Sequence, residues 1–381
     1  MTNNQSMLEN EIRNALSAIH FSDPQHVPFQ AFSREQWAKA GQAGLMGIGL
    51  PEKYGGCGGG DLEIAITGQV IAETCRDMGF SLSWLVQILV SRLIATFGTD
   101  TQQKTLLPQL ISGKQIICFA VSEPDVGPHP KYLKTKAVLS GDHYIIDGEK
   151  IWITNAPVAD MFIIIAITKE QQGKKYYSAF IVPAQTPGVT VSKPFDMPFF
   201  KTSPHGGIQL KQVKVPTSNR LGEPDGIYET MVIPFSAIEN AMMMGPVTGG
   251  FEAQKTILMM HLKKKKATLP NELSFELAQL ETMIYTAKLI VNKAAALARV
   301  SDSARESLFL LIFFRDLGKK IQSQIEKIVD LAEIQPGNVF KDILNDLECS
   351  RGLGEKSILQ KQTRLGRTLF EAFSSEPGFN K

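Results

Sequence analysis

The chain has 381 residues, of which 43% are hydrophobic and 20% are charged. This is the composition of an ordinary globular protein, and it excludes a disordered one. The length suffices for two or three domains with large cores, and the net charge of +2 gives no overall signal for nucleic-acid binding.

The cysteines and histidines show no pattern of a metal or redox site. The four cysteines and six histidines are scattered, without the close spacing that metal ligands need. The sequence therefore predicts a reduced, cytoplasmic protein without a zinc site. The first 19 residues are polar and mixed in charge, unlike a signal or transit peptide. The longest apolar run, at 81–95, is short and contains polar residues, so it predicts a buried helix and no membrane span.

The first third of the chain has the apolar spacing of helices. A glycine-rich stretch, GLMGIGLPEKYGGCGGG at 44–60, interrupts them and predicts tight turns. Ser33 is of a type that caps helices, so a helix is expected to start beside it. The predicted helices are 9–19, 33–43, 61–74, 81–97 and 99–111.

From 115 to 215 the pattern changes to short β-rich runs separated by turns. Strands follow one another without helices between them, which indicates an antiparallel sandwich or barrel. No GxGxxG lies between a strand and a helix, which argues against a dinucleotide-binding doubly wound domain.

The last third returns to helical spacing, and long helices with short connections pack as a bundle. The predicted helices there are 225–260, 272–300, 302–331, 339–347 and 357–373. The predicted fold class is α+β in three parts: an N-terminal helical domain at 1–115, a β domain at 116–224 and a C-terminal helical bundle at 225–381.

Three motifs carry a resemblance to a known family. They are GLMGIGLPEKYGG at 44–56, LLPQLISGKQIICFAVSEPDVG at 106–127 and IDGEKIWITNA at 146–156. In this order, and on an α–β–α layout, they resemble the acyl-CoA dehydrogenase family over nearly the whole chain. One such motif alone is a weak signal, whereas three in the right order are a strong one.

The resemblance implies FAD bound between the β domain and the bundle, with an acyl thioester lying along the flavin. An isoalloxazine ring needs apolar faces and hydrogen-bond donors at its edge, and the hydroxyls of Ser122 and Thr154 are expected to be such donors. A tryptophan in a strand is more often a core residue, so Trp152 gains its expected role only from the motif. By matching position, the cofactor-binding residues are Phe119, Val121, Ser122, Trp152, Ile153, Thr154, Gly352 and Gly354.

The family's reaction needs a desolvated carboxylate as base near the α-carbon of the thioester. The usual C-terminal Y-E-G-T motif is absent: Phe373 falls near its base position, and Glu371 and Glu376 are interpreted as surface carboxylates. A minority of the family places the base on the first long helix of the bundle, where Glu239 falls beside Ile238. The alternative for Glu239, a carboxylate on the helix surface, stays open.

Several family features on the FAD diphosphate side are replaced. Pro128 stands where the family has a serine, so a hydroxyl and a backbone N–H are both missing. Glu348 replaces a glutamine, and LKKKKATLPNE at 262–272 replaces R-x-x-F-G. Directly after the expected base, Asn240 replaces an arginine. The lysines at 263–266 could meet the diphosphate as point charges, although a solvated helix end is the favoured interpretation.

Three hypotheses follow. The first is an FAD-dependent dehydrogenase of acyl-CoA or acyl-carrier thioesters, acting in fatty acid metabolism with Glu239 as base. The second is a non-catalytic subunit that pairs with an active paralogue. The third is a flavin-dependent oxygenase that needs no base. The resemblance also implies a homodimer or tetramer and electron-transfer flavoprotein as redox partner, and no nucleic-acid partner is expected.

Overall fold

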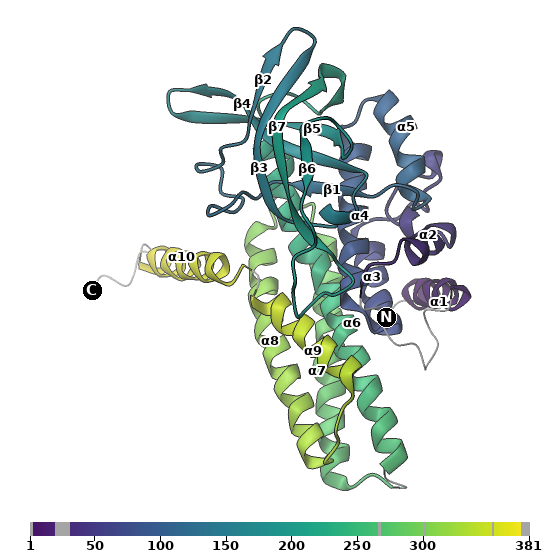
Figure 1. Ribbon diagram of the computed structural model, residues 1–381. Coiled ribbons are helices and arrows are strands. Elements are labelled where there is room, and N and C mark those ends of the chain that lie inside the picture. The colour runs from purple at the N-terminus through teal and green to yellow at the C-terminus, as the bar shows by residue number, and fades with distance from the viewer. Residues whose placement is uncertain (1–2, 20–30, 266–267, 301, 353, 375–381) are drawn as a thin grey trace.

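Helices, then strands, then helices follow one another along the chain in the computed structural model, which describes residues 3–19, 31–265, 268–300, 302–352 and 354–374 (Figure 1). The sheet lies above the long helical bundle, and the N-terminal helices pack beside both (Figure 1). The predicted fold class is therefore confirmed. The changes of element type fall between Ile111 and Ile117 and between Leu221 and Tyr228, and the division into three domains stays a prediction.

The N-terminal helices form largely where their apolar spacing predicts. Ser33 caps α2 as expected, because its side chain accepts a hydrogen bond from the Gln36 N–H at 3.3 Å. The first helix begins at Asn3 instead of residue 9, since its polar first turns carry no apolar periodicity to detect. The helices are α1 (Asn3–Ala18), α2 (Arg34–Gln42), α3 (Asp61–Cys75), α4 (Met78–Phe97) and α5 (Asp100–Ile111).

The glycine-rich stretch between α2 and α3 forms two short 3-10 turns, Leu45–Gly47 and Glu52–Tyr54. Gly44 and Gly55 flank these turns in the left-handed region, which an L-residue enters only with strain. The tight turns expected from this stretch are thus present.

One sheet contains the eight strands of the described residues, in the order β6-β7-β3-β2-β4-β5-β8, with β1 paired to β4. The sheet is mixed, which corrects the expectation of antiparallel pairing alone: β1 and β2 both run parallel to β4. Parallel pairing needs a long return connection, and the β2–β3 hairpin supplies it between β1 and β4. The strands are β1 (Ile117–Ala120), β2 (Lys136–Ser140), β3 (His143–Thr154), β4 (Met161–Gln171), β5 (Lys174–Pro183), β6 (Val189–Val191), β7 (His205–Pro216) and β8 (Arg220–Leu221).

The two faces of the sheet belong to two hydrophobic cores. Along β1, Ile117 packs into the large core shared with the helices, whereas Cys118 packs into a smaller core formed within the β domain. This alternation follows from the two-residue period of a strand. It turns Phe119 towards the helices, where the pocket described below lies.

A π-helical turn, Tyr228–Val232, leads from the sheet into α6. Helix α6 lies against α3 so closely that a Cβ on Gly245 would stand 2.2 Å from the carbonyl oxygen of Ala65. Glycine is required at this contact because the two backbones touch. The bundle helices are α6 (Ile233–Lys265), α7 (Asn271–Leu297), α8 (Ala304–Leu331), α9 (Asn338–Gly352) and α10 (Glu355–Ser374).

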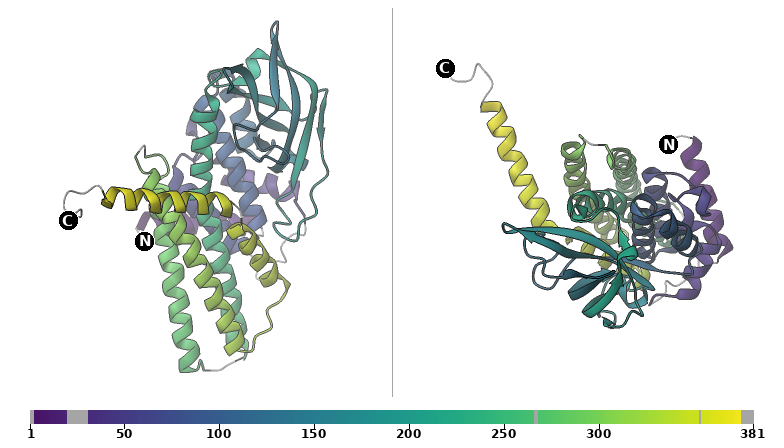
Figure 2. Two further views of the ribbon diagram at one scale, coloured as in Figure 1. Left: turned by 90° about the vertical axis from the view of Figure 1, so that its left-hand side faces the viewer. Right: turned by 90° about the horizontal axis from the view of Figure 1, so that it is seen from above.

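Helix α10 stands away from the rest of the bundle in all three ribbon views (Figures 1 and 2). Its apolar side chains Leu359, Leu369 and Phe370 are exposed. The segment that aligns with the family's C-terminal base motif lies at the end of α10. Glu371 there is exposed, as expected of a surface carboxylate. The side chain of Phe373 and residue 376 lie outside the described part of the chain.

Helix α4 is the described helix that is long and apolar enough to cross a membrane by length and composition, and most of it is buried in the protein. The predicted buried helix at 81–95 is therefore confirmed. Its polar residues fix the strands: the Gln87 amide binds the Ile117 N–H and the Gln115 carbonyl, each at 3.0 Å. Ser83 donates to Asn155, just after β3, at 2.6 Å.

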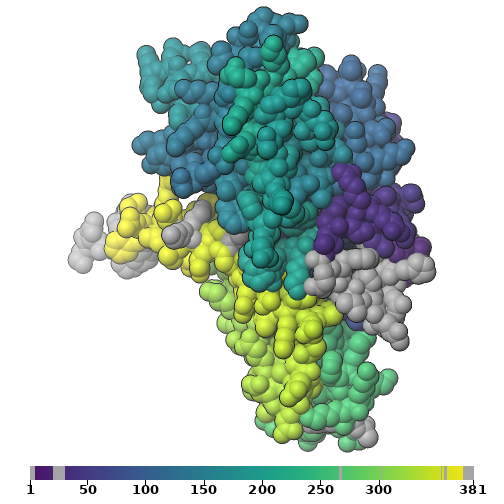
Figure 3. All heavy atoms as spheres, viewed as in Figure 1, coloured from purple at the N-terminus to yellow at the C-terminus, as the bar shows by residue number. Residues whose placement is uncertain are grey.

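Two buried carboxylates join the three parts of the chain. Asp77, before α4, accepts a hydrogen bond from the Thr202 hydroxyl at 2.5 Å, and Asp346 of α9 accepts one from the Phe200 N–H at 2.5 Å. Burial raises the pKa of Asp77 to about 6 and that of Asp346 to about 8. The segment between β6 and β7 thus rests on α9, and the two meet on the face shown in Figure 3.

Candidate active site

A cavity of about 180 Å³ lies between the sheet and the helices, and it brings together residues that are more than 100 positions apart. One side, here called the sheet wall, consists of Phe119, Val121, Ser122, Pro128, Ile151, Trp152, Ile153 and Thr154. The other side, the helix wall, consists of Val86 from α4 and Val232, Phe235, Ser236 and Glu239 from the π-helical turn and α6.

Seven of the nine site residues named from the sequence line this one cavity: the six ring-side residues of the two strand motifs and Glu239. Gly352 and Gly354 do not line it. They lie exposed at the end of α9, and their role stays a prediction.

A β-bulge shapes the sheet wall. The pairing of β3 with β7 shifts register between Lys150 and Ile153, and Trp152 adopts a φ of 58° there. Bulges of this kind redirect side chains next to functional sites. The Trp152 side chain is 61% exposed and meets Phe195 edge to face at 4.9 Å, so Trp152 is not the core residue that a strand tryptophan usually is. The bulge presents an aromatic surface at the cavity.

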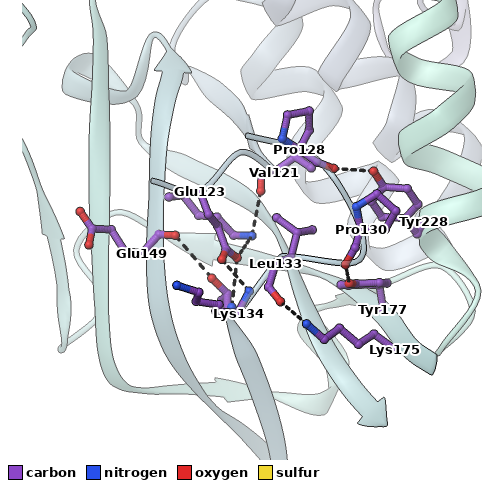
Figure 4. A network of polar contacts seen from close by, with 12 residues as sticks. Val121, Glu123, Pro128, Pro130, Leu133, Lys134, Glu149, Lys175, Tyr177 and Tyr228 are labelled. Carbon is purple, nitrogen blue, oxygen red and sulfur yellow. Dashed lines mark hydrogen bonds and ion pairs between the residues drawn. The ribbon is translucent and has the colours of Figure 1, made fainter. Parts of the chain in front are cut away.

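A buried ion pair supports the sheet wall from behind (Figure 4). Lys150 is fully buried, and its ammonium group donates to Glu123 and to the carbonyl of Val121, both at 2.9 Å. The Glu123 carboxylate also accepts the N–H groups of Lys134 at 2.6 Å and Thr135 at 3.0 Å. These contacts hold the end of β1 and the following loop on β3.

The pKa values of this pair follow from its surroundings. Burial alone would raise the pKa of Glu123, but Lys150 and Thr135 bring it below its ordinary value. Burial lowers the pKa of Lys150 to about 8, although Glu123 opposes part of that shift. Both groups are therefore charged at neutral pH, and the pair is structural.

The hydroxyl of Thr154 lies 3.0 Å from Nε2 of His205, whose Nδ1 faces the Ser203 carbonyl at 2.8 Å. A carbonyl only accepts, so Nδ1 carries the ring proton. Burial lowers the pKa of His205, and the neutral ring then accepts the Thr154 proton at Nε2. With this tautomer, Thr154 offers the cavity a lone pair, and the donor role expected from the sequence stays a prediction.

His205 is a residue that the sequence analysis missed. It lies 51 positions from Thr154 and has no motif around it, so no local signal could have found it. The Ser122 hydroxyl differs from that of Thr154, because it makes no hydrogen bond to another described residue. Ser122 therefore remains able to donate into the cavity.

Glu239 is partly buried in the helix wall, and it has no hydrogen-bond or ion-pair partner among the described residues. Desolvation raises its pKa to about 7. Its neighbour Asn240 is exposed and binds the Ser236 carbonyl of its own helix at 2.7 Å, so Asn240 does not supply the charge of the arginine it replaces. The ring centroids of Phe119 and Phe235 lie 4.6 Å apart, so these two side chains join the sheet wall to the helix wall.

The cavity of about 180 Å³ is smaller than a typical ligand pocket of about 300–1,000 Å³. In its lining, Pro128 has no N–H to offer, and the carbonyl of Pro128 is already bound by Tyr228. No group of three or more His, Cys, Asp or Glu in the described chain could hold a metal ion.

The lysine cluster lies at the other end of α6 from the cavity. Lys263 follows Glu239 by 24 residues, about 36 Å along a helix. Lys265 binds the carbonyls of Ala332 and Glu333 after α8, and Lys263 and Lys264 are exposed. Within one chain, the cluster is a helix end and does not reach this site.

Comparison with known proteins gives two family matches. Residues 2–114 match the N-terminal domain of acyl-CoA dehydrogenases, and residues 118–213 match their middle domain. The chain is 37% identical over 231 residues to a probable acyl-CoA dehydrogenase of Bacillus subtilis, YngJ, and the match covers 59% of each chain.

A second relative, an L-prolyl-[peptidyl-carrier protein] dehydrogenase of Pseudomonas fluorescens, is 32% identical over 270 residues, which cover 69% of this chain and 71% of the relative. Among solved structures, the FAD complex of PigA has a TM-score of 0.80 at 21% identity and covers 96% of this chain and 98% of PigA. That likeness concerns the fold alone. The sequence matches and the fold together place this chain in the acyl-CoA dehydrogenase family.

Proposed function

We propose that the protein is an FAD-dependent dehydrogenase that forms a double bond between the α- and β-carbons of an acyl thioester, with Glu239 as the base. The observation that supports this most directly is the position of Glu239. Its carboxylate, which has no partner within the described part of the chain, lines the same cavity as six predicted ring-side residues, and desolvation raises its pKa to about 7. Buried carboxylates without partners are costly and concentrate at functional sites.

In this proposal the sheet wall binds the flavin ring, and the helix wall supplies the base. Bound FAD supplies the acceptor for the hydride that leaves the β-carbon. Trp152 and Ile153 offer an apolar surface to its ring, Ser122 offers a donor and Thr154 an acceptor. From the helix wall, the Glu239 carboxylate removes the α-proton. The electron pair of the broken α C–H bond then forms the new double bond to the β-carbon.

A small cavity favours a short acyl group as substrate. The cavity has a volume of about 180 Å³, below that of a typical ligand pocket, and the rings of Phe119 and Phe235 form part of its lining, 4.6 Å apart. The thioester carrier is CoA or a carrier protein. The carrier-protein dehydrogenase among the relatives acts on a prolyl group, which is a small acyl group of this kind.

The test is anaerobic mixing of the FAD-loaded protein with short acyl thioesters on CoA and on a carrier protein. The flavin absorbance is expected to bleach with a short acyl group, and Glu239→Gln is expected to slow the bleaching about 10²–10⁴-fold while FAD stays bound. Glu229→Gln, an exposed carboxylate ten positions earlier, is the matched control for loss of a charge.

The outcomes separate the three hypotheses. Bleaching that persists at the wild-type rate in Glu239→Gln rejects the assignment of the base. If the protein retains no flavin after FAD is added and the excess removed, the non-catalytic subunit is supported. The missing hydrogen-bond donors at Pro128 also favour that hypothesis. Flavin that is not reduced by any thioester but reacts with oxygen after chemical reduction supports the oxygenase, which has no use for Glu239.

A further inference from the structure

The loop at 121–135 lines the cavity at Pro128, and side chains from elsewhere hold this loop by its backbone carbonyls (Figure 4). Three donors take part besides Lys150. The Tyr228 hydroxyl donates to the Pro128 carbonyl, the Tyr177 hydroxyl to the Pro130 carbonyl, and the Lys175 ammonium to the carbonyls of Lys131 and Leu133.

The two prolines explain why carbonyls carry this role. Pro128 and Pro130 have no N–H, so the carbonyl is the only backbone polar group that either can use to fix the loop. A tyrosine hydroxyl meets each of them. Burial raises the pKa of Tyr177 to about 12 and that of Tyr228 above its ordinary value, so both hydroxyls keep the proton that they donate.

The two tyrosines differ in what they attach the loop to. Tyr177 belongs to β5 and ties the loop to its own sheet. Tyr228 belongs to the π-helical turn before α6, so its bond to Pro128 joins the helix wall to the sheet wall. Their rings lie 5.2 Å apart. The two tyrosines therefore form a matched pair that differs in the element to which each attaches the loop.

Tyr228 begins the face of the helix that the cavity uses. Val232, Phe235, Ser236 and Glu239 follow it at intervals of three and four residues and line the cavity, and such intervals place side chains on one helix face. The π-helical turn also fixes the backbone of Tyr228, because the Ile233 N–H donates a hydrogen bond to the Tyr228 carbonyl. Turns of this type are frequent at functional sites.

We propose that Tyr228 is a positioning residue, which latches the sheet wall to the helix wall through Pro128 and so keeps water away from Glu239. The inference rests on the proposed role of Glu239 as base. It assigns no chemical step to Tyr228, whose hydroxyl binds a backbone carbonyl and not the substrate. Opening the latch lets the two walls separate, and the Glu239 carboxylate then regains solvent.

The experiment compares Tyr228→Phe with Tyr177→Phe. Each change removes one oxygen atom, leaves the ring in place and frees one proline carbonyl of the same loop. A first measurement needs no FAD: unfolding of the apo protein across pH 4–9, for each variant with and without Glu239→Gln, gives the pKa of Glu239 in the folded state. Tyr228→Phe is expected to lower that pKa by about one unit, whereas Tyr177→Phe leaves it at the wild-type value.

A second measurement uses the FAD-loaded protein and the acid limb of kcat/KM with a short acyl thioester. Of the described residues that line the cavity, Glu239 alone is ionisable between pH 4 and 9, and His205, bonded to Thr154, has a pKa below its ordinary 6.5. The acid limb therefore reports Glu239, and it is expected to move about one pH unit lower in Tyr228→Phe alone.

An unchanged Glu239 pKa in Tyr228→Phe, or an equal shift in both variants, overturns the proposed role of Tyr228. If the FAD-loaded wild-type protein oxidises no thioester, the proposed function fails. The measurement on the apo protein then still decides whether Tyr228 has the proposed role.

Discussion

Glu123 lies behind the sheet wall and Glu239 lies in the helix wall, and the surroundings of the two carboxylates shift their pKa values in opposite directions. Glu123 accepts hydrogen bonds from Lys150, Lys134 and Thr135. Burial would raise its pKa, but Lys150 and Thr135 bring it below the ordinary value. Glu239 has no partner among the described residues, and desolvation raises its pKa to about 7. A buried carboxylate with partners organises structure, whereas one without partners is poised to take a proton.

The largest expected effect comes from removing the partner of Glu123. Lys150→Met leaves a buried carboxylate without its countercharge, and this is expected to lower the free energy of unfolding by about 3–5 kcal/mol. Urea unfolding at pH 7 measures it. The double variant Lys150→Met with Glu123→Gln removes both charges and is expected to regain most of the loss. A loss below about 1 kcal/mol in the single variant would show that water reaches the pair.

Glu239→Gln should do the reverse and stabilise the protein, but only at high pH. The folded-state pKa of about 7 exceeds the ordinary 4.5, so the folded state holds a proton that the unfolded state releases as the pH rises between these values. Wild-type stability therefore falls over that window, by up to about 3 kcal/mol. The variant is expected to exceed the wild type by that amount at pH 8.5 and to match it at pH 4.

This comparison is measured by urea unfolding at the two pH values, with Glu229→Gln as the exposed control. A stability difference between Glu239→Gln and the wild type that does not change with pH would mean that Glu239 is solvated in the folded protein. The contrast with Glu123 would then be lost.

The pH dependence of catalysis gives the next effect in size. Glu239 must be unprotonated to act as base, so kcat/KM is expected to fall about tenfold per pH unit below pH 7 and to be flat just above it. Rates of anaerobic flavin reduction between pH 5.5 and 8.5 provide the measurement. An acid limb near pH 4.5 would indicate either a solvated Glu239 or another base.

The smallest expected effect concerns a partnered group in the sheet wall. Thr154→Val removes the hydroxyl that His205 orients, and the loss of one neutral hydrogen bond is expected to weaken FAD binding by about 1 kcal/mol, roughly fivefold. Fluorescence titration of the apo protein with FAD measures the change. Thr154→Ser keeps the hydroxyl and should bind FAD as the wild type does. Weakening by Thr154→Ser as large as that by Thr154→Val would contradict the role of the hydroxyl, because the serine retains it.

The local features of this protein were readable from the sequence. The helix cap at Ser33 and the turns of the glycine-rich stretch depend on neighbouring residues alone. The ring-side residues from Phe119 to Thr154 lie within two short contiguous motifs, so a single match names them all. Glu239 was found by alignment, but its alternative on the helix surface could be weighed only with the cavity in view.

Tertiary structure alone decided the rest, because it depends on segments that meet only after the chain has folded. The parallel pairing of β1 with β4 required the intervening hairpin to fold out of the way. The contacts Lys150–Glu123, Thr154–His205 and Tyr228–Pro128 span 27, 51 and 100 positions. No local pattern fixes such pairs, since they follow from how the sheet and α6 pack. That packing gives Glu123 its partners and leaves Glu239 without one among the residues that the structure describes.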